Sequence, residues 1–205
     1  MTRQVGIDNT SADYFAFLDS DDVLMPYAVE VWRNAAENIP DADLFHSSFM
    51  EQTVHDGRTS MMKHDHAVTF CHGKLYKTSF VRKFDIRNSP EVKWADDSFF
   101  NVMCMELGNC GEIKIPMYLW LNNPNSVTRA GGKPFFADFV HAMLLATRFV
   151  KTKGIKELDF TILGLTEIQR NFARIDEASL KEYEELLKEF PPNIAEQYTY
   201  NSPHH

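Results

Sequence analysis

The sequence predicts an α/β region followed by an all-helical tail. Short β-prone runs alternate with helical periods up to about residue 130, whereas only helical periodicity is found from Pro134 onward. Of the 205 residues, 44% are hydrophobic and 13% aromatic, which is enough for a continuous core and too many for a disordered chain. We therefore expect two parts, residues 1–130 and residues 131–205.

The first elements are predicted to be a strand, a loop and a helix. Residues 14–18 are β-prone and run into a polar segment, after which Pro26 opens an apolar-periodic stretch. Proline suits the first turn of a helix, because it has no N–H to lose there. We expect this helix to end at Pro40 and Asp41.

A hairpin and two further helices are expected next. Asp56-Gly57 separates two extended-looking stretches and favours the positive φ values of a tight hairpin turn. Residues 73–84 can finish a strand and turn into a short helix, and a longer helix follows from Asp97 to the helix-stopping Gly108-Asn109. Beyond it, Pro116 is expected to divide residues 112–121 into two short strands.

The tail contains three segments with helical periodicity. They cover residues 135–154, 157–175 and 177–190, and Pro191-Pro192 is expected to close the last helix.

Charge and composition exclude several classes of protein. There are 21 Lys and Arg against 29 Asp and Glu, a net charge of −8, which argues against a nucleic-acid or anionic-membrane surface. The longest apolar runs, such as residues 14–18 and 142–146, fall far short of the roughly 20 residues that cross a bilayer. No secretory signal begins the sequence, and three cysteines cannot all pair. We therefore expect a cytoplasmic protein without a transmembrane segment.

The first acidic cluster follows the strand at residues 14–18. Asp19 and Asp21 flank one residue, so their carboxylates can converge on one hard divalent cation at the end of a buried strand. The alternative is helix capping near Pro26, but capping needs only one or two such residues.

The second acidic cluster lies in KWADDSFF, residues 93–100. Asp96 and Asp97 precede an apolar-faced helix, so capping explains them when they are taken alone. Together with a metal-holding cluster, one of them can serve as a general base. Trp94 can stack on a sugar or anchor the loop, and the sequence does not choose between these roles.

Four segments of the chain resemble, in order, motifs of family 2 glycosyltransferases. RQVGIDNTSADYFAFLDSDDVLMP resembles the segment in which a helix leads into a strand that ends in a DxD motif. GKLYKTSF and ADDSFF resemble the two motifs that follow it. PMYLWLNNPNSVTR resembles the family's Pro-x-Tyr-x-Tyr stretch and Ser-Val-Thr turn. The resemblance covers about residues 3 to 130.

The resemblance implies a partial GT-A fold, with a mixed sheet and helices. It also implies inverting transfer of a sugar from a nucleotide-diphospho-sugar donor to a hydroxyl on a saccharide or other acceptor.

Individual roles follow residue by residue from the matched motifs. Asp97 would be the catalytic base, and Asp96 and Trp94 would bind the acceptor. Asp21, with Asp19, would hold Mn²⁺ or Mg²⁺ on the diphosphate. The remaining donor-binding residues would be Arg3 and Arg129.

The resemblance also predicts a missing part. The family's nucleotide-binding half would precede Arg3, where this sequence has two residues. We therefore expect weak or absent activity of the chain alone, or completion of the fold by a second chain or a homo-oligomer.

Two alternative functions remain open at the level of sequence. Residues 19–23 also fit the DxDx(T/V) pattern of haloacid dehalogenase-like phosphatases, with Asp19 as nucleophile. A non-catalytic transferase-like module is the other alternative, because removing strands from a sheet leaves unpaired edge groups that invite a partner.

Overall fold

The computed structural model describes residues 2–65, 69–122 and 132–199. Its strands are β1 (Tyr14–Phe15), β2 (Val23–Leu24), β3 (Leu44–His55), β4 (Arg58–His64), β5 (Leu75–Lys77) and β6 (Cys110–Leu121). Its α-helices are α1 (Thr2–Asn9), α2 (Ala28–Asn38), α3 (Thr78–Phe84), α4 (Asp96–Leu107), α6 (Gly132–Thr152), α7 (Asp159–Arg170), α8 (Glu177–Lys188) and α9 (Pro192–Tyr198). A 3₁₀ turn, η1, covers Phe172–Arg174.

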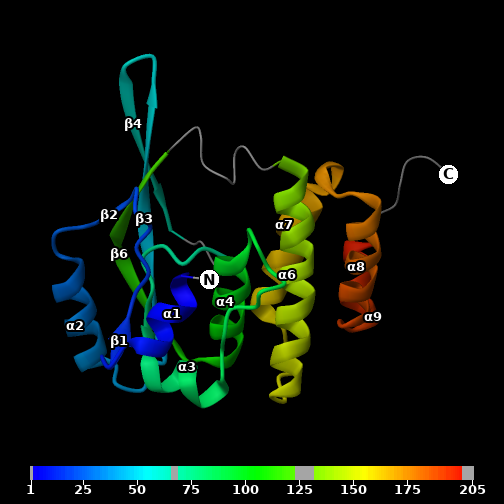
Figure 1. Cartoon of the computed structure of the whole chain (residues 1–205), viewed down its shortest axis with the longest axis horizontal. Coiled ribbons are helices and arrows are strands. Elements are labelled where there is room, and N and C mark those ends of the chain that lie inside the picture. Colours follow the sequence, from blue (N-terminus) through cyan, green and yellow to red (C-terminus); the bar gives the residue numbers. More distant parts are fainter. Residues whose placement is uncertain (1, 66–68, 123–131, 200–205) are drawn as a thin grey trace.

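The six strands form one mixed sheet in the order β1-β5-β3-β6-β2, with β4 paired to β3 outside this path. β3 runs parallel to β6, and the other pairs are antiparallel. The long β3–β4 hairpin projects beyond the rest of the sheet (Figure 1). The α/β architecture predicted from the sequence is therefore confirmed.

The hairpin turn and the end of α4 form where expected, and the prediction of two strands around Pro116 is wrong. Asp56 and Gly57 have φ values of 49° and 72°, the positive angles of the predicted turn. Gly108 ends α4 with φ −105° in extended backbone, where an added Cβ would lie 2.8 Å from Leu44 and Phe80, so close packing explains this glycine. Residues 110–121 form one strand rather than two, and Pro116 lies where the pairing register between β3 and β6 shifts.

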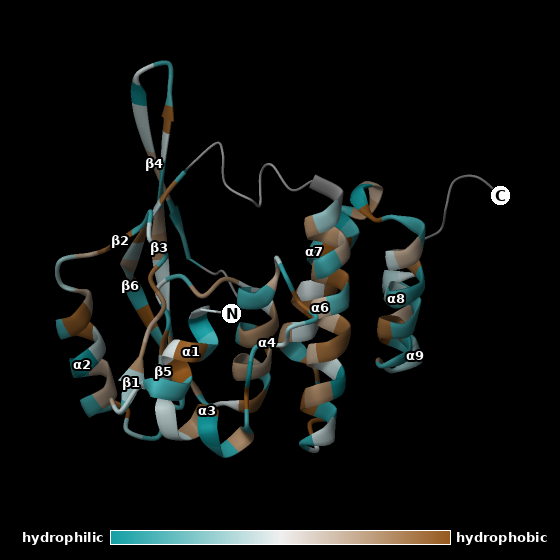
Figure 2. Ribbon diagram, viewed as in Figure 1, coloured by the Kyte–Doolittle hydropathy of each residue, from teal (hydrophilic) through white to brown (hydrophobic). Residues whose placement is uncertain are grey.

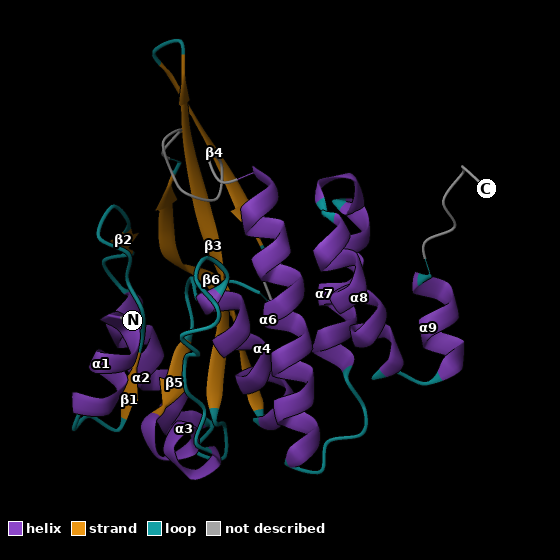
Figure 3. Ribbon diagram, turned by 45° about the vertical axis from the view of Figure 1, so that its right-hand side comes forward, coloured by secondary structure: helices purple, strands orange, loops and turns teal. Residues whose placement is uncertain are grey.

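Helices cover both faces of the sheet. α2 packs on one face through a cluster that includes Trp32, Phe45 and Met117. On the other face lie α4 and then α6 (Figure 3), and hydrophobic residues extend along both helices (Figure 2). This larger core joins Leu44 of β3 to Met143 of α6, so one cluster contains residues from both parts expected from the sequence.

The three predicted tail helices are present as α6, α7 with η1, and α8. A fourth, α9, begins where the sequence predicted an end, because Pro192 occupies the first turn of a new helix. No helix within the described residues combines the length and apolar character needed to cross a membrane.

Candidate functional site

The first acidic cluster forms a turn that is fixed to β6. The Asp22 N–H donates to the Asp19 carbonyl at 3.1 Å. The buried Tyr118 hydroxyl donates to Asp22 Oδ2 at 2.6 Å and accepts the Asp19 N–H at 3.2 Å. The Leu121 N–H donates to Asp22 Oδ1 at 2.9 Å. These bonds direct the Asp22 carboxylate inward, whereas Asp21 is exposed.

His72 completes a group of three potential metal ligands. Within the described residues, one ligand atom each from Asp19, Asp22 and His72 lies within 4.8 Å of the others. The His72 ring stacks on Tyr118 with ring centroids 4.6 Å apart and is 9% exposed. Its Nδ1 is buried and has no hydrogen-bond partner in the described part of the chain. Two carboxylates and an imidazole form a donor set that suits a divalent cation.

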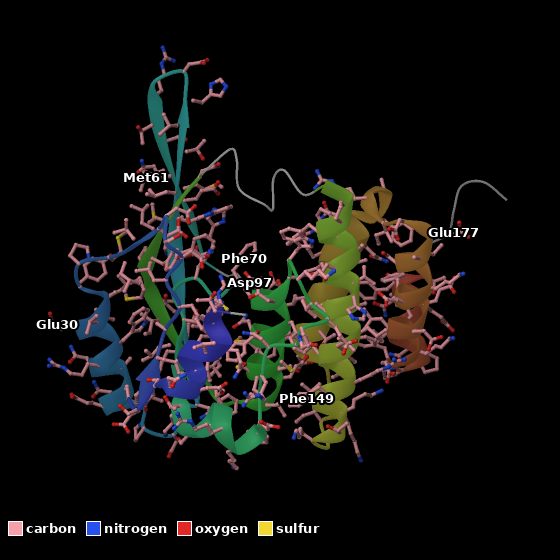
Figure 4. The ribbon with its side chains drawn as sticks, viewed as in Figure 1. Glu30, Met61, Phe70, Asp97, Phe149 and Glu177 are labelled. Carbon is pink, nitrogen blue, oxygen red and sulfur yellow. The ribbon has the colours of Figure 1, made fainter. Side chains whose placement is uncertain are left out.

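Arg3 joins the two acidic clusters. From α1, its guanidinium donates to Asp19 Oδ1 at 2.6 Å and to Asp96 Oδ2 at 3.0 Å. Asp97, labelled in Figure 4, follows Asp96 in the first turn of α4, and its carbonyl accepts the Cys71 thiol at 3.6 Å. Since one side chain contacts both clusters, the structure brings them into a single site.

The carboxyl groups of this site differ in their pKa values. The His72 ring and the Arg3 guanidinium hold the pKa of Asp19 at about 2. Burial raises the pKa of Asp22, although the Tyr118 hydroxyl opposes this effect. Burial also raises the pKa of Asp97, against the influence of Arg3. Asp19, which stays charged, and Asp97, which binds a proton more readily than an ordinary aspartate, thus lie in the same site.

Capping explains the second cluster only in part. α4 begins at Asp96, and its N-cap residue Ala95 has no side-chain hydrogen bond to the helix. Asp97 instead accepts the N–H of the following residue, Ser98, at 2.7 Å. Trp94, just before the helix, is 46% exposed, so it is not buried as a loop anchor.

The structure thus brings Arg3, Asp19 and Asp96 into direct contact. Arg129 lies outside the described residues. The sequence had assigned no role to Asp22, although it belongs to the same acidic run as Asp19. His72 was also missed, and the signal for it was weak: a single histidine preceding the GKLY segment.

The fold is mixed α/β and resembles a glycosyltransferase domain. The matching solved structures include S. aureus TarS, a glycosyltransferase, as its 1–349 segment in complex with UDP, with a TM-score of 0.62 and 15% identity. The same segment in complex with UDP-GlcNAc gives a TM-score of 0.61 and 12% identity. These matches cover 94% of this chain but only 60% and 62% of the TarS chains. Searches against protein-family models and against curated proteins find no match.

Proposed function

We propose that this chain is part of a metal-dependent, inverting glycosyltransferase of the family 2 type. It would transfer a sugar from a nucleotide-diphosphate donor to an acceptor hydroxyl. The observation that carries the proposal is the Arg3 bridge, which places the acidic cluster suited to a cation beside the cluster suited to a base. The UDP and UDP-GlcNAc complexes of TarS support a UDP-sugar donor.

The group of Asp19, Asp22 and His72 would hold Mn²⁺ or Mg²⁺. The mixed oxygen and nitrogen donors fit such an ion, and the His72 Nε2 faces Asp19 Oδ2 at 3.9 Å. When bound, the ion would neutralise charge on the departing diphosphate. Asp21, which the family motif favours as the ligand, is exposed and outside this group.

Asp97 would act as the base. Its raised pKa makes it a better proton acceptor than an ordinary aspartate. As the acceptor oxygen bonds to the anomeric carbon, Asp97 takes the hydroxyl proton and the bond from that carbon to the diphosphate breaks, which inverts the configuration. Arg3 donates a hydrogen bond to Asp96 Oδ2, so the other carboxylate oxygen, Oδ1, would orient the acceptor hydroxyl.

The metal assignment is tested by titrating Mn²⁺, with and without UDP, into wild type and three variants. Asp22→Asn and His72→Gln should each weaken Mn²⁺ binding at least about tenfold, since each removes a proposed ligand. Asp21→Asn is the matched control and should change the affinity less than about threefold. The reverse ranking would show that Asp21 holds the ion. Absence of Mn²⁺ binding in wild type, both with and without UDP, would overturn the metal-dependent function proposed.

The base assignment is tested with Asp97→Asn in a UDP-release assay with UDP-GlcNAc and candidate acceptors. The variant should lose transfer while its affinity for UDP with Mn²⁺ stays within about twofold of wild type. Loss of UDP binding, or full transfer, would refute the role of Asp97. The glycosyltransferase-like fold does not favour the phosphatase alternative, whose test remains a fluoroberyllate-sensitive phosphatase activity lost in Asp19→Asn.

A further inference from the structure

A carboxylate from the helical tail binds the backbone just before the second acidic cluster. Asp138 of α6 accepts the Lys93 N–H through both oxygens, at 3.1 and 3.0 Å. Its Oδ2 also accepts the N–H groups of Trp94, at 2.6 Å, and Ala95, at 2.8 Å. Three consecutive amides therefore converge on one side chain that lies more than 40 positions away in the sequence.

This arrangement fixes the backbone that leads into α4, up to its N-cap residue Ala95. Ala95 has no side chain able to cap α4. A negative charge near a helix start is favourable, and hydrogen bonds to a charged acceptor are stronger than those between neutral groups. Because α4 and α6 pack against each other, Asp138 reaches the segment from a rigid neighbouring helix.

We propose that Asp138 is a positioning residue that sets the orientation of Asp96 and Asp97. These two residues directly follow the three bound amides, so fixing residues 93–95 fixes where α4 begins. Asp96 then meets Arg3, and Asp97 accepts the Ser98 N–H. The role in transfer rests on the proposed function, whereas the structural role does not.

The structural role is tested by backbone amide NMR of the whole chain. In Asp138→Ala, exchange of the Trp94 and Ala95 amides should accelerate at least about tenfold. The Ser98 amide resonance, which reports the Asp97 carboxylate, should also shift. Asp138→Asn keeps an acceptor oxygen, so it should show smaller changes in the same direction, and it replaces the alanine variant if that variant does not fold.

Asp176→Ala is the matched control. Asp176 caps α8 in the same tail by accepting the Ser179 N–H at 2.8 Å, so its loss perturbs a comparable bond away from the site. The Trp94, Ala95 and Ser98 signals should be unchanged in this variant. Unchanged signals in Asp138→Ala, or equal changes in the control, would overturn the proposal.

The kinetic test separates positioning from folding. Asp138→Ala should lower kcat at least about tenfold with the KM for the donor within about twofold, with Asp138→Asn intermediate and Asp176→Ala equal to wild type. Altered amide signals with unchanged kcat would refute the role in catalysis. If the chain alone transfers no sugar, as the missing half predicts, the amide signals alone decide whether Asp138 positions the cluster.

Discussion

Tyr118 holds the turn of residues 19–22 in place, and Tyr118→Phe isolates that role. The substitution removes only the hydroxyl, which donates to Asp22 Oδ2 at 2.6 Å and accepts the Asp19 N–H at 3.2 Å. The ring that stacks on His72 is kept. Any loss of stability therefore reports the hydrogen bonds to the turn rather than a cavity.

The magnitude follows from the charge on the acceptor. A hydrogen bond to a charged group contributes about 1.5 to 3 kcal/mol to the free energy of unfolding, and a bond between neutral groups contributes about 1 kcal/mol. Since Asp22 is partly exposed and keeps its bond from Leu121, we expect a loss of about 2 kcal/mol. For a chain of 205 residues this lowers Tm by about 4 to 8 °C.

The loss should depend on pH, because the Tyr118 hydroxyl favours the charged form of Asp22. Its removal raises the folded-state pKa of Asp22 beyond the rise that burial already causes. The difference in stability is thus complete at pH 8, and it shrinks toward the neutral-bond value of about 1 kcal/mol as the pH falls through the folded-state pKa.

Urea unfolding at pH 8 and pH 4, with a chelator present, measures the loss of stability and its dependence on pH. Tyr183→Phe is the matched control, because its hydroxyl donates to the neutral Tyr198 carbonyl at 2.6 Å. This control should lose about 1 kcal/mol at both pH values. An unchanged midpoint in Tyr118→Phe, or a loss equal to that of the control at both pH values, would refute the reasoning.

Two further stability predictions concern Asp97 and Gly73. Because burial raises the pKa of Asp97, the group favours the folded state less as the pH rises through its folded-state pKa. The Tm of Asp97→Asn should therefore exceed that of wild type at pH 8 and equal it at pH 3.5. An equal increase at both pH values would contradict a raised pKa of Asp97 in the folded state. Gly73 has φ +66°, and an added Cβ would collide with Ser47 Oγ, so Gly73→Ala should lose at least about 2 kcal/mol in urea unfolding. Gly57→Ala, with φ +72° and open space around it, should lose only about 1 kcal/mol, and equal losses would show that crowding at Gly73 is unimportant.

Local patterns predicted most of the elements, because each depends on a few neighbouring residues. Asp56-Gly57 sets a turn through its own backbone angles, and the apolar period after Pro26 defines α2. Pro116 shows the limit of this reasoning. The effect of Pro116 depends on the partner strand β3. The pairing register between β3 and β6 shifts near Pro116, and β6 continues as one strand.

The site was harder to predict, because distant groups decide which carboxylate faces inward. The spacing of Asp19 and Asp21 suggested a ligand pair. Tyr118 and Leu121, about 100 residues further along the chain, bind Asp22 instead. No pattern within residues 17–22 contains that information.

Both ends of α4 are hydrogen-bonded to the helical tail, and the start of α4 carries part of the acidic site. At its start, Asp138 of α6 binds the amides of residues 93–95. Near its end, Glu106 accepts the N–H and hydroxyl of Thr161, at 2.7 and 2.8 Å, and so serves the first turn of α7. Neither N-cap residue, Ala95 or Leu158, caps its helix through its side chain, and a carboxylate from the other segment binds the backbone at each helix start. The position of Asp97 therefore depends on residues beyond 131 as directly as on the acidic motif itself, and substitutions in the tail should affect the site through α4.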